Sequence, residues 1–353
     1  MNKNRPNIKV MMVGTAEQSR GGITTVIRIL KGLPLWGRFV FNWLGVQMQG
    51  CKWQKICFAL KSYIYALFEI WKYDIIHFHA VPVFACLIIQ LPVYLLALVG
   101  HKKIIIHLHM GNQIGEYKDK RLFNWYIKRA DLIVVLANVW KEKFKKEWFP
   151  HQKTPVEVLY NPYFPVESID YEKREHTILM AAYLNENKGY DVLFRACQRI
   201  LPKFPDWKLV IMGDGDVNGA KQLAKELGID KQTIFAGYVV GDEKHRIFQE
   251  GSIYCMCSYQ EGFPMVVLEA WGYGIPLITT PVGGLPDVIE EGKNAIVFPF
   301  GDVDCLANSL QLLIEDEKKR KLMSSFSKEF VEHKFSIDIV NHQLEDIYIR
   351  LLS

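Results

Sequence analysis

The sequence predicts an α/β protein made of two Rossmann-like domains, and three observations lead to this prediction. Apolar runs of about five to seven residues alternate with amphipathic stretches of about ten to twenty along the whole chain, which is the pattern of β-α-β units in parallel sheets. The 353 residues exceed the roughly 250–300 at which a single core usually divides into domains. Two prolines, Pro162 and Pro165, interrupt the pattern near its middle.

Six apolar runs in each half are predicted to be strands. In the first half they cover residues 8–13, 39–44, 73–79, 103–109, 132–136 and 156–160, and in the second half residues 177–182, 207–213, 233–238, 252–257, 276–280 and 295–299. The segments 306–314 and 338–352 carry apolar residues at i, i+3, i+4 and i+7 and are predicted to be helices. We therefore expect domains at residues 1–163 and 164–335, followed by a C-terminal helix within 336–353.

Charge is distributed unevenly along the chain. Residues 1–175 carry 25 Lys and Arg against 13 Asp and Glu, which is +12, and residues 176–353 carry 18 against 25, which is −7. The overall formal charge of +5 is too small to indicate nucleic-acid binding, so no nucleic-acid partner is expected. The asymmetry favours an anionic surface or ligand on the first half alone.

The cysteines and the N-terminus indicate a cytoplasmic protein. The seven cysteines form no CxxC pair and no Cys/His zinc spacing, and free thiols are typical of a reducing compartment. The first residues lack the small-residue cleavage site of a secretory signal. We expect the protein in the cytoplasm, either free or attached peripherally to the inner face of the cell membrane.

The segment 82–99 is the most apolar part of the chain. Its only side-chain polar groups are those of Gln90 and Tyr94, and as a helix it would measure about 27 Å, just short of a comfortable membrane span. The predicted strands 73–79 and 103–109 flank it and should lie in one parallel sheet, which a membrane crossing would separate. We predict a crossover helix that is buried or lies against a membrane.

Two loops have the composition of anion-binding sites. Gly21-Gly22 joins a predicted strand to a helix, where glycines let the backbone approach a diphosphate, although a purely structural turn is favoured if this loop is taken alone. The segment EGFPMVVLE places Glu261 in a loop, Pro264 at the first helical position and Glu269 inside the helix. Alternatively, Glu261 and Glu269 are only solvated charges that flank an apolar helix and bind no ligand. The flanking GFP and GYGIPLITTPVGGLPDVI segments disfavour this alternative.

The string YQEGFPMVVLEAWGYGIPLITTPVGGLPDVIEEGKNAIVFP resembles the donor-site signature of glycosyltransferase family 4, the retaining nucleotide-sugar glycosyltransferases. Glu261 and Glu269 fit the E-x7-E pattern of that family without a gap. The resemblance extends to Gly21-Gly22, to the strand-end His109, to the turn at Asn161 and to VIMGDGD, which contains Gly213. It implies the GT-B architecture, in which two Rossmann-like domains face a central cleft and the C-terminal helix crosses back to the first domain.

The resemblance also implies the roles of individual residues. The donor would be a nucleotide diphosphate-sugar held mainly by the second domain, with Glu269 on the ribose, Glu261 on the transferred sugar and Lys188 on the diphosphate. His109 would position the sugar near the reacting carbon, so that His109, Lys188 and Glu261 form the expected catalytic set. The expected donor-binding residues are Gly21, Gly22, Gly213, Gly262, Phe263, Met265, Val266 and Glu269. No cofactor and no metal are expected.

One position departs from the family pattern. The family usually has Gly-Arg-Leu followed by Lys-Gly at the first turn of the second domain, with both cations on the diphosphate. This chain keeps Lys188-Gly189 but has Tyr183 where the arginine is expected. Either another residue neutralises the phosphates or the donor binds differently.

Two further motifs admit a metal-site interpretation. Asp214-Gly215-Asp216 has the form of a DxD metal motif, but its place between a strand and a helix favours a strand-end turn with a helix N-cap. His77 and His79, like His107 and His109, alternate along predicted strands and would share a face. The spacing supplies no third ligand, carboxylate or cysteine, so structural or ligand-bonding histidines are favoured over a zinc site.

Residues 52–72 form a predicted helix with a basic and apolar composition. One face carries Trp53, Ile56, Leu60, Ile64, Leu67 and Trp71, and a second aromatic and lysine-rich stretch covers 141–149. Stretches of this composition have two interpretations. They either lie on an anionic lipid surface or belong to helices that pack on their sheet with the lysines outward, and the sequence leaves both open.

Together these features predict transfer of a sugar to a lipid-linked or surface-polysaccharide acceptor bound by the first domain, which would also contact an anionic membrane. A sugar-nucleotide epimerase of the same architecture is one alternative; a phosphorylase would need a pyridoxal lysine context that the sequence lacks. The other alternative is a non-catalytic, membrane-docked partner whose donor site has degenerated at Tyr183.

Overall fold

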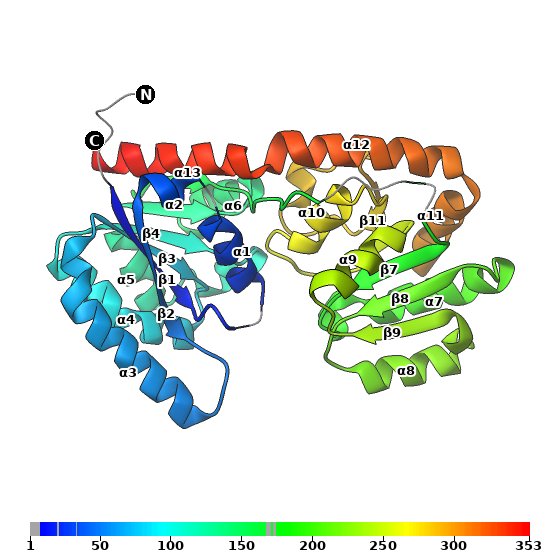
Figure 1. The fold of residues 1–353 in the computed structure, drawn as a ribbon, viewed down its shortest axis with the longest axis horizontal. Coiled ribbons are helices and arrows are strands. Elements are labelled where there is room, and N and C mark those ends of the chain that lie inside the picture. The colour runs from blue at the N-terminus through cyan, green and yellow to red at the C-terminus, as the bar shows by residue number, and fades with distance from the viewer. Residues whose placement is uncertain (1–7, 20, 33, 167–170, 172–173) are drawn as a thin grey trace. The chain divides into compact units, whose positions relative to one another are not determined.

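The computed structural model describes all residues except 1–7, 20, 33, 167–170 and 172–173 (Figure 1). The chain forms two compact units. Unit 1 comprises residues 1–162 together with 337–353, and unit 2 comprises residues 163–336. Both are α/β units.

Unit 1 contains a six-stranded parallel sheet in the order β2-β1-β3-β4-β5-β6 within the described residues. Its strands are β1 (Lys9–Thr15), β2 (Val40–Gln47), β3 (Ile75–Ala80), β4 (Lys103–Leu108), β5 (Leu132–Val135) and β6 (Val156–Val158). Its helices are α1 (Gly22–Lys31), α2 (Leu35–Arg38), α3 (Lys52–Glu69), α4 (Phe84–Val99), α5 (Arg121–Arg129), α6 (Asn138–Lys143) and α13 (Ile337–Leu352). The central strands β3, β4 and β5 are buried almost throughout, which explains their continuous apolar character.

Unit 2 contains a second six-stranded parallel sheet, in the order β12-β11-β10-β7-β8-β9 within the described residues. Its strands are β7 (Thr177–Ala181), β8 (Lys208–Met212), β9 (Thr233–Gly237), β10 (Ile253–Met256), β11 (Leu277–Thr279) and β12 (Ala295–Val297). Its helices are α7 (Tyr190–Ile200), α8 (Val217–Glu226), α9 (Gly241–Glu250), α10 (Met265–Gly272), α11 (Val303–Glu315) and α12 (Glu317–Phe335). Each of the twelve predicted strands is therefore present, shifted by a few residues at its ends.

The C-terminal helix α13 belongs to unit 1, as the predicted fold requires. The Asn341 side-chain carbonyl on α13 accepts a hydrogen bond from the Leu35 amide at 3.1 Å, and Tyr348 Oη lies 2.7 Å from His77 Nδ1 on β3. Both contacts are buried, so they fix α13 against the start of α2 and the centre of the sheet.

The segment 82–99 forms the crossover helix α4 between β3 and β4, which pair in parallel as predicted. Leu87, Val93 and Ala97 are buried, whereas Phe84, Leu95 and Val99 are exposed. Within the described part of the chain, no helix combines the length and the apolar character needed to cross a membrane. All seven cysteines lie in that part, and each is a free thiol.

The strand orders place a topological switch point in each sheet. In unit 2 the chain runs from β7 outward through β8 and β9, and then returns to β10 on the other side of β7. In unit 1 the same change of direction lies between β1 and β3. Loops that leave the carboxyl ends of strands at such points diverge, and open α/β sheets bind their ligands there.

Candidate active site

Lys188 and Glu261 meet at the switch point of unit 2, although they are 73 residues apart in the sequence. Lys188 follows β7 and Glu261 follows β10, which are neighbouring strands. Lys188 Nζ lies 2.6 Å from Glu261 Oε1, and the two side chains are only 23% and 16% exposed. The structure thus brings together a cation and a carboxylate that the sequence predicts for the donor site.

The turn around Gly189 and the loop after β10 hold this ion pair in place. Gly189 has a φ of +62°, and a Cβ there would lie 2.3 Å from the Cys257 carbonyl oxygen, so only glycine fits. The Tyr259 amide donates to the Asn187 carbonyl at 2.8 Å, and the Asn187 side chain donates to the Gln260 carbonyl at 3.1 Å. These bonds fix the backbone on both sides of the pair.

Glu269 lies on α10 and forms a second ion pair. Its Oε1 lies 2.7 Å from Lys244 Nζ, which comes from α9. Its Oε2 is buried and has no hydrogen-bond partner in the described part of the chain. Lys244 is a site residue that the sequence analysis missed, because no motif marks it and only the packing of α9 beside α10 brings it to Glu269.

The N-terminus of α10 follows Glu261 directly. Pro264 is the N-cap and Met265 the first helical residue, so the proline lies one position before the place predicted for it. No side chain caps this end of the helix among the described residues. Phe263 is buried and packs against Phe335 at a ring distance of 5.6 Å, whereas Met265 and Val266 are partly exposed. The Phe263 ring is therefore part of the core of unit 2.

The Asp214-Gly215-Asp216 segment forms a strand-end turn with a helix N-cap, which confirms that interpretation. The Asp216 carboxylate accepts a hydrogen bond from the Gly219 amide at 3.0 Å and caps α8. Gly213, at the end of β8, has a φ of +135°, and a Cβ there would lie 1.8 Å from the Ala182 carbonyl oxygen. Gly213 therefore allows the turns after β7 and β8 to lie against each other.

Tyr183 occupies the turn after β7, where the family pattern has arginine. Its side chain is 64% exposed. The position is thus open to a ligand, but it contributes a phenol instead of a guanidinium. Lys188 remains the predicted side-chain cation on this turn.

Gly21 and Gly22 lie at the switch point of unit 1, between β1 and α1. Gly21 is the N-cap of α1 with a φ of +131°, and no side chain caps this end within the described residues. Among the described residues, a Cβ added to either glycine would meet nothing within 4 Å. Backbone geometry favours glycine at position 21, and the amides at the N-terminus of α1 suit an anion.

His109 follows β4 and contacts a second histidine. Its Nε2 lies 2.8 Å from His79 Nδ1, and its backbone amide donates to the Ala80 carbonyl at 3.0 Å. Desolvation lowers the pKa of His109 to about 3, so the imidazole is neutral at physiological pH. A neutral ring orients a hydroxyl by hydrogen bonding, but it does not supply a positive charge.

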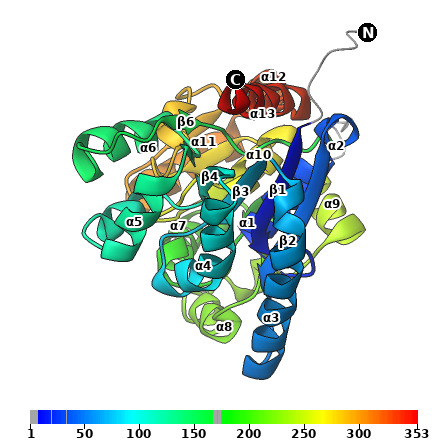
Figure 2. The same ribbon diagram turned by 90° about the vertical axis from the view of Figure 1, so that its left-hand side faces the viewer.

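Helix α3 packs on β2 of the sheet through Ser62 and Ala66, whereas the apolar face predicted from the sequence points away from the sheet. Trp53 is 75% exposed and Ile64 60%, and the other four apolar residues of this face are at least 40% exposed. Only Ser62 and Ala66 of the helix are buried. Helices α3 and α4 lie side by side, joined by the Tyr63 hydroxyl, which donates to the Ile89 carbonyl at 2.8 Å (Figure 2).

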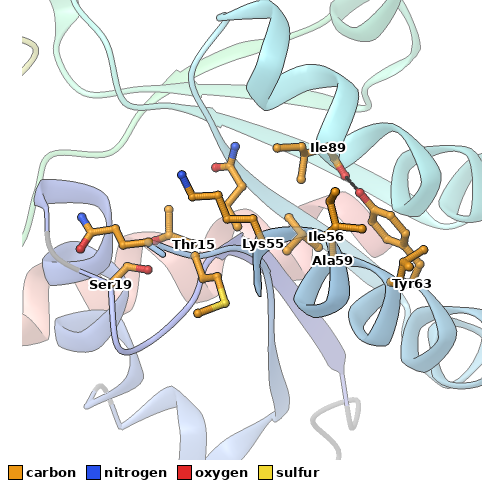
Figure 3. Close-up of a pocket in the computed structure, with 12 residues that line it drawn as sticks. Thr15, Ser19, Lys55, Ile56, Ala59, Tyr63 and Ile89 are labelled. Carbon is orange, nitrogen blue, oxygen red and sulfur yellow. Dashed lines mark hydrogen bonds between the residues drawn. The ribbon is translucent and has the colours of Figure 1, made fainter. Parts of the chain in front are cut away.

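A cavity of about 530 Å³ opens between α3, α4 and the carboxyl ends of β1 and β2 (Figure 3). Ile56, Ala59 and Ile89 give it apolar walls, and Thr15, Ser19 and Lys55 add polar groups. The cavity is therefore suited to an amphipathic molecule, and Ile56 and Leu60 connect it to the exposed face of α3.

Comparison with known proteins relates the second unit to glycosyltransferases. Residues 167–330 match the family model described as glycosyl transferases group 1. The chain is 29% identical over 208 residues to an uncharacterized glycosyltransferase of Haemophilus influenzae, with 57% of each chain covered. It is 30% identical over 187 residues to the D-inositol 3-phosphate glycosyltransferase of Corynebacterium aurimucosum, covering 50% of this chain and 44% of the relative. The chain thus spans about half the length of these curated relatives.

Solved structures share the fold along nearly the whole chain. The HepE protein of Anabaena in complex with UDP-glucose matches with a TM-score of 0.77 at 16% identity, over 96% of this chain and 99% of that one. The sucrose-phosphate synthase of Thermosynechococcus elongatus matches with a TM-score of 0.80 at 15% identity, over 98% and 99%. The two Rossmann-like domains of GT-B glycosyltransferases are thereby confirmed as the fold, and the resemblance to glycosyltransferases is confirmed. The narrower assignment to family 4 stays a prediction.

Proposed function

We propose that this chain, whose second unit carries a glycosyl transferases group 1 domain, transfers a sugar from a nucleotide diphosphate-sugar to an acceptor hydroxyl. The observation that carries the proposal is the buried Glu269 Oε2, which has no hydrogen-bond partner in the described residues while Oε1 is held by Lys244. An unpaired buried carboxylate oxygen is costly. A ribose hydroxyl of the nucleotide would satisfy it.

The diphosphate would lie between Lys188 and the N-terminus of α10. Lys188 is paired with Glu261 at 2.6 Å, and an arriving diphosphate competes for its ammonium with two strong acceptors. The helix terminus adds amides and a partial positive charge. Because both groups stabilise the charge that grows on the leaving diphosphate, the transfer needs no metal at the donor phosphates.

Release of Lys188 would leave Glu261 to accept a hydroxyl of the transferred sugar. His109 and the Gly21-Gly22 loop of unit 1 stay predicted contacts of the sugar and of the phosphates, as the family resemblance implies. Positioning and electrostatic stabilisation then account for the reaction, without a covalent nucleophile and with retention of the anomeric configuration.

The acceptor is proposed to be a lipid-linked glycan bound by unit 1. The cavity beside α3 combines apolar walls with Lys55, and the adjoining α3 face exposes six large apolar side chains. Residues 1–175 carry an excess of 12 positive charges (25 against 13), which suits an anionic membrane surface. These features support the proposal that the protein works at the cytoplasmic face of a membrane, with α3 against the lipid.

Binding of nucleotides to the purified full chain tests the donor site. UDP is the first ligand to use, because HepE, which shares this fold, was solved with UDP and UDP-glucose. We expect UDP or another nucleoside diphosphate to raise the melting temperature of the parent by more than that of Glu269→Gln at the same ligand concentration. If no nucleotide raises the melting temperature of the parent, the proposal is contradicted and the chain is better explained as a non-catalytic partner.

Product analysis separates transfer from epimerisation. A transferase releases nucleoside diphosphate in proportion to glycosylated acceptor, whereas an epimerase changes the sugar of the donor in the absence of any acceptor. Conversion of the donor sugar without an acceptor would therefore overturn the transferase assignment.

A further inference from the structure

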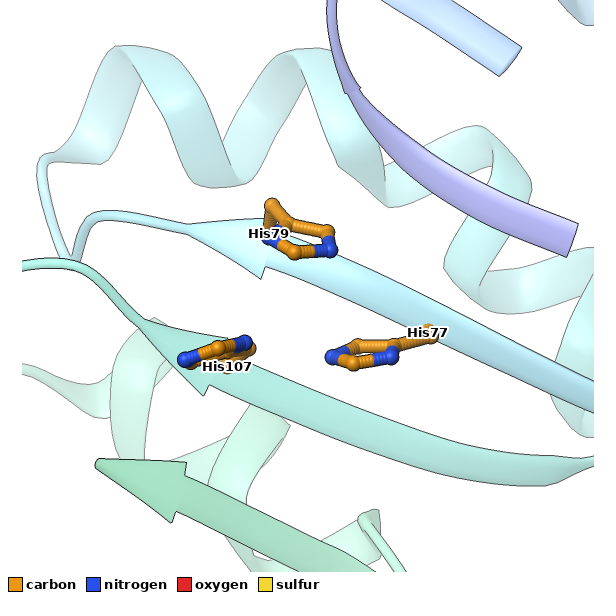
Figure 4. A group of neighbouring side chains, drawn as sticks. All are labelled: His77, His79 and His107. Carbon is orange, nitrogen blue, oxygen red and sulfur yellow. The ribbon is translucent and has the colours of Figure 1, made fainter. Parts of the chain in front are cut away.

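Three buried histidines of unit 1 converge from two neighbouring strands. His77 and His79 alternate along β3, and His107 lies on β4 opposite His79 in the register. The ring centroids are 4.6 Å apart for His77 and His79, 5.5 Å for His77 and His107, and 5.1 Å for His79 and His107 (Figure 4). All three side chains are at most 1% exposed.

Four nitrogens of this cluster have no hydrogen-bond partner in the described part of the chain. They are His77 Nε2, His79 Nε2 and both ring nitrogens of His107. Buried polar atoms are nearly always paired in native proteins, so four such atoms in one place need a physical explanation.

The remaining nitrogens of the two β3 histidines are already held. His77 Nδ1 lies 2.7 Å from Tyr348 Oη on α13, and His79 Nδ1 lies 2.8 Å from His109 Nε2. Metal-bound histidines have this arrangement, in which one nitrogen is bonded to a neighbouring group and the other is left to bind the metal.

We propose that His77, His79 and His107 form a site for one zinc ion, bound through Nε2 of His77, Nε2 of His79 and one nitrogen of His107. One ring nitrogen from each of the three histidines lies within 4.8 Å of the corresponding nitrogens of the other two. Zinc–nitrogen bonds measure about 2.0–2.1 Å, which brings the ligand nitrogens of a tetrahedral site to about 3.3 Å from one another. The His77 and His79 rings lie nearly parallel, 17° apart, so binding would require the rings to approach and one of them to turn its lone pair toward the ion. Three imidazoles without a thiolate suit zinc among the abundant divalent ions, and a fourth position would take water or an anion.

Zinc on His79 Nε2 would place the remaining proton of that ring on Nδ1, facing His109 Nε2. His109 would then carry its own proton on Nδ1, so the ion would fix the tautomer of His109. This site is separate from the donor phosphates, which unit 2 is proposed to bind without a metal.

Metal analysis of the untagged full chain tests the proposal. The protein is stripped with a chelator, loaded with zinc alone, desalted and measured by mass spectrometry for metal content. We expect about one zinc per chain in the parent and less than a tenth of that in His77→Phe and His107→Phe. The matched control is His101→Asn, at an exposed turn of the same unit, which should keep the parental content. A parent without zinc, or equal zinc in all four proteins, would overturn the site.

Cobalt provides a second measurement if the phenylalanine variants do not fold. Cobalt bound to the parent by three imidazoles gives the intense visible absorption of a four-coordinate site, and equimolar zinc should abolish it. A spectrum no stronger than that of cobalt in buffer would overturn the proposal without reference to any variant. Neither measurement depends on sugar transfer, so failure here leaves the donor site untouched.

Discussion

Lys188 Nζ lies 2.6 Å from Glu261 Oε1, in a pair that is largely shielded from water. The turn after β7 and the loop after β10 carry the two residues to the same point of the unit 2 sheet. Removal of either partner leaves the other charge shielded and uncompensated. Variants of this pair must therefore be compared with controls for stability before a loss of turnover is assigned to substrate binding.

Lys188→Met should reduce turnover by more than tenfold, because Tyr183 replaces the second cation that the family pattern supplies. Tenfold corresponds to about 1.4 kcal/mol of transition-state stabilisation. The exposed Lys225→Met on α8 is the matched control and should leave the rate unchanged. If Lys188→Met is stably folded and keeps more than a tenth of the parental rate, Lys188 is not the principal cation on the donor diphosphate. Tyr183→Arg should tighten donor binding.

Glu269→Gln and Glu261→Gln should differ in which step they impair. Loss of a charged acceptor costs roughly 1.5–3 kcal/mol, so Glu269→Gln should weaken nucleoside diphosphate binding by that amount, as measured by calorimetry. Glu261→Gln should lower turnover while nucleotide affinity stays close to that of the parent. Lys244→Met should behave like Glu269→Gln, because Lys244 holds the same carboxylate. If the parent and these variants all bind the nucleotide equally well, the assignment of Glu269 to the ribose is wrong.

Asp216→Ala should lower the free energy of unfolding by about 0.5–2 kcal/mol, since it deletes the N-cap of α8. Nucleotide affinity should remain unchanged in this variant, in Asp214→Asn and in the parent treated with EDTA. Denaturant unfolding and calorimetry measure the two quantities. A nucleotide affinity that requires manganese or magnesium, and that Asp214→Asn abolishes, would show that the segment binds a metal.

The exposed face of α3 should bind anionic vesicles in a salt-dependent manner. Each lysine near such a surface contributes about 1 kcal/mol, and salt screens this attraction. Replacement of Trp53 and Ile64 by serine should release the full chain from the vesicles in sedimentation, without loss of stability, because both side chains are exposed. Leu322→Ser, at an exposed position of unit 2, is the control. Binding that persists in high salt or in the serine variant would place the contact elsewhere.

Periodicity predicted the fold well because the strands are buried on both faces. The runs 73–79 and 103–109 are apolar apart from their histidines and the charged residues Asp74 and Lys103 near their starts, and they form the neighbouring strands β3 and β4, which are buried almost throughout. Lys188 and Glu261, which the Lys188-Gly189 and E-x7-E motifs singled out, lie together at the switch point of unit 2, while their roles toward a donor stay predictions. Local sequence was sufficient there, because each motif belongs to a single strand-loop-helix unit.

Long-range packing escaped prediction. Nothing in GDEKHRIFQE marks Lys244 as the partner of Glu269, since that contact depends on how α9 lies beside α10. The spacing of the histidines supplied no third metal ligand, because pairing of β3 with β4 creates the cluster. The packing of α3 was also undetermined, since lysines and apolar residues suit a covered helix as well as an exposed one.

The most direct test of the proposed transfer uses the parent enzyme, a nucleotide diphosphate-sugar and a membrane lipid extract. Released nucleoside diphosphate and the masses of the extracted glycolipids are measured together, with Lys188→Met as the control. We expect one nucleoside diphosphate for each acceptor that gains one sugar, and no gain with the variant. Absence of any mass gain across a panel of donors, while the parent still binds nucleoside diphosphate, would contradict the proposed transfer to a lipid-linked acceptor.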